Sequence, residues 1–202
     1  MNRREQENFN YFKHILTKKS LSPLVQRVAQ DLNTVLAGSE LPLCELLSQK
    51  AVSEIASNSY ERNIASHFSQ IIGDTVRAAL SDNDPDLLWP NNRPLEIKVT
   101  AGESWRGGKY SKRESCYLLI ARDKACHEKV FVALAHVPEE EWTKPKKNKA
   151  GEEKYYATTF GKKRLLEYVD AGKACVLVGD LHEVMRKDGT PHNKKRIKLQ
   201  KT

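Results

Sequence analysis

The chain has 202 residues, of which 39% are hydrophobic and 30% charged, and a formal net charge of +8. This length suits one compact domain with a real hydrophobic core, and no stretch approaches the roughly 18 consecutive apolar residues of a membrane span. The first residues lead into no apolar run of a secretory signal, so we expect a cytoplasmic protein with no membrane contact.

Residues 1–80 are predicted to be helical, because apolar residues recur there at helical spacing. We expect one amphipathic helix over 24–36, a second over 43–56, and a third that Ser59 caps and that carries apolar residues up to Ile72 on one side. Gly38 and Pro42 mark the first break between helices, and Ser57-Asn58-Ser59 marks the second. We treat 1–58 as an N-terminal helical region and 59–202 as the core domain.

The pattern changes after Ser81 from helical spacing to short apolar runs separated by turn residues. A helix is predicted over Thr159–Val169. Strands are predicted over Asp86–Trp89, Leu95–Thr100, Tyr117–Ala121, Val130–Leu134 and Ala174–Val178. Helices followed by strands interleaved with a helix predict a mixed α/β (α+β) domain with a central sheet flanked by helices.

The most informative stretch runs from Pro85 to Val99. A turn-rich gap between two short strands predicts a hairpin that brings Asp86 beside the following strand. Side chains of a strand alternate between its faces, so Glu96 and Lys98 share one face while their apolar neighbours take the other. A surface hairpin with an ordinary Glu/Lys pair is the simpler interpretation, but the conjunction of Pro-Asp, a short gap and Glu-x-Lys favours a functional site.

Two carboxylates from adjacent strands suit Mg²⁺, which prefers oxygen ligands. We predict that Asp86 and Glu96 bind the metal together with the backbone carbonyl of Ile97 and water. A metal there lowers the pKa of bound water and neutralises charge on a phosphoryl transition state. Lys98 is predicted to orient or help deprotonate the attacking water, or to offset phosphate charge. Asp84, which precedes Pro85, is predicted to shape the turn.

Pro85, Asp86, Glu96 and Lys98 fill every place of the PD-(D/E)xK motif, and the chain resembles that nuclease superfamily, most of all its type II restriction endonucleases. The resemblance covers roughly residues 60–180. It implies a restriction-endonuclease-like core, Mg²⁺ dependence, and cleavage that leaves a 5′-phosphate and a 3′-hydroxyl. Glu61 matches the place where many of these enzymes carry an accessory acid. It is equally well explained as a carboxylate in the first turn of a helix, where the helix dipole favours it.

Basic and aromatic residues after the catalytic strand predict a DNA-contacting loop. Gly107-Gly108 allows close backbone approach within this loop. A second arm is predicted over 138–156, which holds Trp142 and a lysine cluster, and basic residues gather again at the C-terminus. The predicted DNA-contacting residues are Trp105, Arg106, Lys109, Tyr110, Lys112, Arg113, Lys146 and Lys147.

One catalytic hairpin cuts one strand, so cleavage of both strands of double-stranded DNA is most simply explained by a two-fold homodimer. The apolar helices of 20–56 are candidates for the dimer interface, although packing within one subunit is the simpler explanation. Two other functions stay open from the sequence. One is a repair nuclease or nicking enzyme of the same superfamily, and the other is a non-catalytic nucleic-acid-binding protein whose three charged residues are only surface groups.

Overall fold

The computed structural model describes residues 1–37, 47–80, 84–106, 115–122, 129–142 and 159–184. Its helices are α1 (Arg3–Ile15), α2 (Lys18–Ala37), α4 (Gln49–Ile72) and α5 (Lys162–Asp170). Its strands are β1 (Arg77–Ala78), β2 (Leu87–Trp89), β3 (Arg93–Thr100), β4 (Ser104–Arg106), β5 (Ser115–Arg122), β6 (Val130–Val137), β7 (Thr159–Gly161) and β8 (Ala174–Val178). Short 3-10 turns are η1 (Pro90–Asn92), η2 (Glu139–Glu141) and η3 (Leu181–Val184).

In the described part of the chain, six strands form a central mixed sheet in the order β1-β2-β3-β5-β6-β8. Strands β3 and β5 are parallel, and every other pair of neighbours is antiparallel. Strands β4 and β7 form a separate two-stranded sheet. The prediction of a mixed α/β domain with a central sheet flanked by helices is therefore confirmed.

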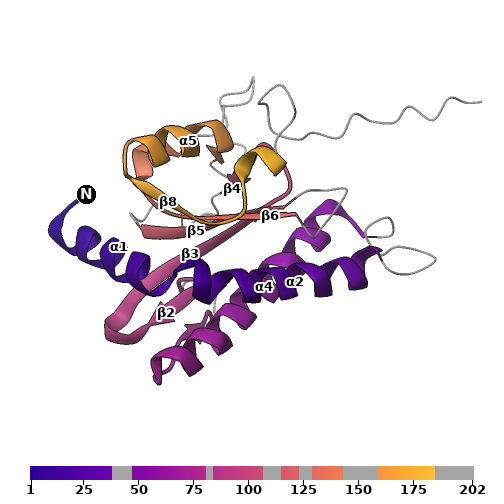
Figure 1. Cartoon of the computed structure of the whole chain (residues 1–202), viewed down its shortest axis with the longest axis horizontal. Coiled ribbons are helices and arrows are strands. Elements are labelled where there is room, and N and C mark those ends of the chain that lie inside the picture. Colours follow the sequence, from indigo (N-terminus) through magenta and orange to yellow (C-terminus); the bar gives the residue numbers. More distant parts are fainter. Residues whose placement is uncertain (38–46, 81–83, 107–114, 123–128, 143–158, 185–202) are drawn as a thin grey trace, which may run out of the picture.

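Helices cover both faces of the sheet (Figure 1). One hydrophobic core lies between the sheet and α1, α2 and α4, and a second lies between the sheet and α5. Strand β5 serves both, because its side chains alternate: Leu118 belongs to the first core and Leu119 to the second. The apolar side of α2 is buried in the first core through Leu24, Val25, Val28, Leu32 and Leu36. These side chains therefore pack within the chain, as the simpler explanation of the apolar helices had it.

Helix α4 corrects the predicted break at Ser57-Asn58-Ser59, because it runs unbroken from Gln49 to Ile72. Ser59 does not cap a helix: its Oγ donates to the carbonyl of Ile55 at 2.8 Å, one turn back inside the helix. The actual N-cap is Ser48, whose side chain accepts from the backbone N–H of Ala51. Small polar residues that resemble a helix start are here accommodated in a helix interior.

The predicted helix over Thr159–Val169 is also corrected at its beginning. Thr159–Gly161 forms strand β7, and α5 starts only at Lys162. The reason is pairing with a distant segment, since Phe160 lies opposite Trp105 of β4 in the small sheet.

Within the described residues, no helix has the length and apolar character needed to cross a membrane.

Gly179 follows β8 with a positive φ of 72°, and a Cβ at this position would lie 2.2 Å from the carbonyl oxygen of Val130. Gly172 has a similar φ of 70° but nothing within 4 Å of the corresponding position. We expect Gly172→Ala to cost about 1–2 kcal/mol of unfolding free energy through backbone strain alone. Gly179→Ala should cost about 1–3 kcal/mol more, because the clash is added. Urea denaturation of both variants measures the difference, and equal losses would contradict the close approach.

Candidate active site

The β2–β3 hairpin positions the candidate site. Its strands pair antiparallel with Leu87 opposite Leu95. The turn between them contains Asn91 and Asn92 at φ values of 59° and 54°, a left-handed conformation that asparagine tolerates better than most residues. Asp86, immediately before β2, is thereby placed beside Ile97 and Lys98 of β3, as predicted.

Strand β3 separates its apolar and charged side chains as the alternation predicts. Leu95 and Ile97 are buried in the core against α1, α2 and α4. Glu96 and Lys98 extend from the opposite face and are partly buried, with 22% and 17% of their side chains exposed. The burial of Leu95 and Ile97 thus fixes the direction of Glu96 and Lys98.

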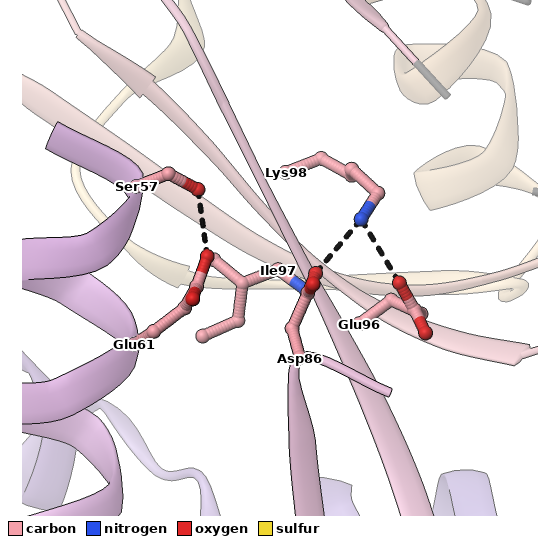
Figure 2. A network of polar contacts seen from close by, with 6 residues as sticks. All are labelled: Ser57, Glu61, Asp86, Glu96, Ile97 and Lys98. Carbon is pink, nitrogen blue, oxygen red and sulfur yellow. Dashed lines mark hydrogen bonds and ion pairs between the residues drawn. The ribbon is translucent and has the colours of Figure 1, made fainter. Parts of the chain in front are cut away.

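Lys98 joins the two carboxylates (Figure 2). Its Nζ donates to Oδ2 of Asp86 at 2.7 Å and to Oε2 of Glu96 at 2.9 Å. Asp86 Oδ2 also accepts from the backbone N–H of Ile97 at 2.7 Å. In an extended strand the N–H and C=O of one residue point to the same side. The carbonyl of Ile97 is therefore directed towards the side of the strand on which Asp86 lies.

Glu61 approaches the same site from α4. Its Oε1 accepts from the Ser57 hydroxyl at 2.8 Å, one turn earlier on the helix (Figure 2). Burial raises the pKa of Glu61, the Ser57 hydrogen bond lowers it, and Asp86 raises it through charge repulsion, with a raised pKa as the result. Because α4 begins at Gln49, Glu61 lies in the helix interior, and the explanation from a first-turn helix dipole is wrong.

Burial and mutual charge set the protonation of the other two groups. Burial raises the pKa of Glu96, and repulsion from Asp86 adds to this, while Lys98 opposes it. Burial alone would lower the pKa of Lys98, but attraction to Glu96 and Asp86 outweighs burial and raises it. Lys98 is therefore held as an ammonium ion between two carboxyl groups.

The residues present fit a hard divalent cation in donor chemistry and in convergence. Two carboxylate oxygens approach one nitrogen from different segments of the hairpin, and the Ile97 carbonyl is directed to the same side. No group of three or more His, Cys, Asp or Glu side chains suited to a metal occurs among the described residues. A metal at Asp86 and Glu96 therefore needs backbone, water or substrate oxygens to complete its coordination.

The neighbouring residues of the motif take structural places. The side chain of Asp84 accepts from the backbone N–H of Leu80 at 3.3 Å, as expected for a residue that shapes the turn before Pro85.

Ser57 was missed as a site residue, because the sequence predicted a break between helices at this position. A spacing of four residues from Glu61 is the signal that identifies it once the helix is continuous.

The predicted DNA-contacting residues divide into three groups. The prediction that Trp105 contacts DNA is wrong. Its side chain is fully buried in the second core, and its Nε1 donates to the carbonyl of Ile120 at 2.9 Å. The pairing of β4 with β7 directs it inward, and the next residue, Arg106, is exposed. Trp142 of the predicted second arm is buried as well. Outside the described residues lie Lys109, Tyr110, Lys112, Arg113, Lys146 and Lys147.

Comparison of the chain with models of known protein families gives no match, and comparison with characterised proteins gives none either. The function therefore has to be argued from the site.

The raised pKa of Glu61 predicts a pH-dependent stability. A carboxyl whose folded-state pKa lies above its ordinary value of about 4.5 stabilises the fold below that pH, and this contribution is lost as the pH rises through the folded-state pKa. We expect Glu61→Gln to gain stability relative to the wild-type chain as the pH rises from about 4.5 to 7 in EDTA.

Urea denaturation across this pH range measures the effect. Glu54→Gln removes a carboxylate from an exposed position of the same helix and controls for the loss of charge. A wild-type and Glu61→Gln difference that stays constant with pH would show that burial does not perturb this carboxyl.

Proposed function

We propose that this chain is a Mg²⁺-dependent endonuclease of the PD-(D/E)xK type that hydrolyses double-stranded DNA, and that it acts as a type II restriction endonuclease. The observation that carries the proposal is the convergence of Asp86, Glu96 and Lys98 on the β2–β3 hairpin, where the Lys98 ammonium lies within 3 Å of an oxygen of each carboxylate. The mixed sheet with helices on both faces and the net charge of +8 also support it.

Each residue of the site has a definite part in the proposed reaction. Asp86, Glu96 and the Ile97 carbonyl would hold Mg²⁺, which when bound would supply positive charge at the scissile phosphate and acidify water. Lys98 orients the attacking water and offsets the charge that develops on the phosphoryl group. Water attacks phosphorus and the 3′-oxygen leaves, so the products carry a 5′-phosphate and a 3′-hydroxyl.

Glu61 is the accessory acid of this proposal. It is partly buried and interacts electrostatically with both Asp86 and Lys98. Ser57 holds one of its oxygens by a hydrogen bond. Arg106, exposed at the end of β4, is the one predicted DNA-contacting residue that the described part of the chain presents to solvent.

A mapped plasmid tests the activity directly. We expect the purified chain with Mg²⁺ to produce discrete fragments, and EDTA to abolish them. Nicked circles alone would favour a repair or nicking enzyme of the same superfamily. DNA binding that is indifferent to Mg²⁺, with no cleavage, would favour a non-catalytic binding protein and overturn the proposal.

Substitutions at the site should separate chemistry from binding. Asp86→Ala and Glu96→Ala are expected to abolish cleavage, because each removes a metal ligand, while folding and DNA binding are largely retained. Lys98→Ala should lower the single-turnover rate by about 10²-fold or more. Asp84→Ala is the matched control, since this carboxylate lies two residues from Asp86 and bonds within the turn. Near wild-type cleavage by Glu96→Ala would remove the metal assignment.

The homodimer rests on the geometry of the reaction, because two scissile phosphates are reached in one binding event by two sites related by a two-fold axis. We expect the DNA-bound protein to sediment at about twice its chain mass. Mixed dimers of wild-type and Glu96→Ala chains should nick plasmid rather than linearise it. A monomer that linearises plasmid without accumulating nicked circles would rule the arrangement out.

A further inference from the structure

Lys98 occupies the position between the carboxylates that a metal ion would also use. Its ammonium lies 2.7 Å from Asp86 and 2.9 Å from Glu96, and the two oxygens that it contacts come from different segments of the hairpin. All three side chains are largely shielded from water, with 17% of Lys98, 23% of Asp86 and 22% of Glu96 exposed. Figure 2 shows the ammonium facing both carboxylates at once.

A divalent cation and this ammonium cannot hold the same two oxygens together, because like charges at such short range repel strongly. We infer that Lys98 is an internal counter-ion, which holds Asp86 and Glu96 together in the metal-free protein and competes with the divalent cation for them. This inference rests on the proposed function, because it takes the metal site from there. It adds that metal loading requires the Lys98 contacts to break.

The surroundings of Lys98 provide for such an exchange. Without the ammonium, two largely buried carboxylates would repel each other, and burial already disfavours the charge of Glu96. Lys98 therefore offsets one of the two negative charges until a divalent cation binds. Its flexible four-carbon stem allows the ammonium to move without a change in the backbone. Glu61 is a third carboxylate whose charge interacts with Lys98 and offers an alternative partner on α4.

The inference predicts that removal of the ammonium tightens metal binding. We expect Lys98→Met to bind Mn²⁺, which takes the oxygen ligands that Mg²⁺ takes, about tenfold or more tightly than the wild-type chain does, a gain of about 1.4 kcal/mol or more. The measurement is calorimetric titration of Mn²⁺ into the full chain without DNA, at about pH 8, so that the carboxyl groups are ionised.

Three further variants make the titration decisive. Lys98→Gln should bind Mn²⁺ more tightly as well, and it replaces Lys98→Met if that variant does not fold. Lys163→Met removes the same charge from an exposed position of α5, which packs against β8, the edge strand three places from β3 in the sheet, and its affinity should stay at the wild-type value. Glu96→Gln should weaken binding in every background.

The outcomes distinguish this inference from the proposed function. Tighter Mn²⁺ binding by Lys98→Met, together with slower cleavage, supports both. Tighter Mn²⁺ binding by Lys98→Met, with a wild-type chain that cuts no DNA, supports the counter-ion and rejects the nuclease. Equal or weaker binding by both Lys98 variants, with a wild-type chain that binds Mn²⁺ and cleaves, overturns the counter-ion alone. If neither the wild-type chain nor either Lys98 variant binds Mn²⁺, the metal site does not exist and the inference is overturned with it.

Discussion

The candidate site depends on how strand β3 is held in place. One face of β3 has to be buried, and the part of its edge that β2 does not pair needs another hydrogen-bond partner. Its apolar side chains are buried against α1, α2 and α4, which directs Glu96 and Lys98 to the other face. Strand β2 ends its pairing with β3 at Leu87 opposite Leu95, so the N–H of Ile97 lies beyond the strand ladder. The carboxylate of Asp86 accepts that N–H in place of a backbone carbonyl. One aspartate thus completes the sheet edge and belongs to the candidate site.

Concentrating charge in a partly buried position opposes stability, and the molecule offsets this locally. The raised pKa values of Glu61 and Glu96 express the unfavourable burial of two carboxylates close to Asp86. Lys98 and the Ser57 hydroxyl compensate in part, the first by charge and the second by a hydrogen bond. Such groups are typical of functional sites, because a site that binds a cation has to keep unneutralised anionic charge available.

The two cores have different relations to the site. The first core joins α4 to β3 and so fixes Glu61 relative to the hairpin, although helix and strand are separate in the sequence. The second core holds Trp105, Trp142 and Phe160 together beneath α5. It anchors β4, which follows β3 along the chain, so that the exposed Arg106 lies at the end of a strand that is paired with β7.

The sequence by itself determined the hairpin, the common face of Glu96 and Lys98, the approach of Asp86 and the class of the fold. These features follow from turn residues and from an alternation of period two, which are properties of adjacent residues. Only the tertiary structure decided that α4 continues through Ser57-Asn58-Ser59, that Ser57 contacts Glu61, and that Trp105 is buried. The burial of Trp105 depends on the pairing of β4 with β7, and the continuity of α4 depends on its packing against β3 and α2. Both features depend on contacts with distant parts of the chain, which cannot be predicted from the local sequence.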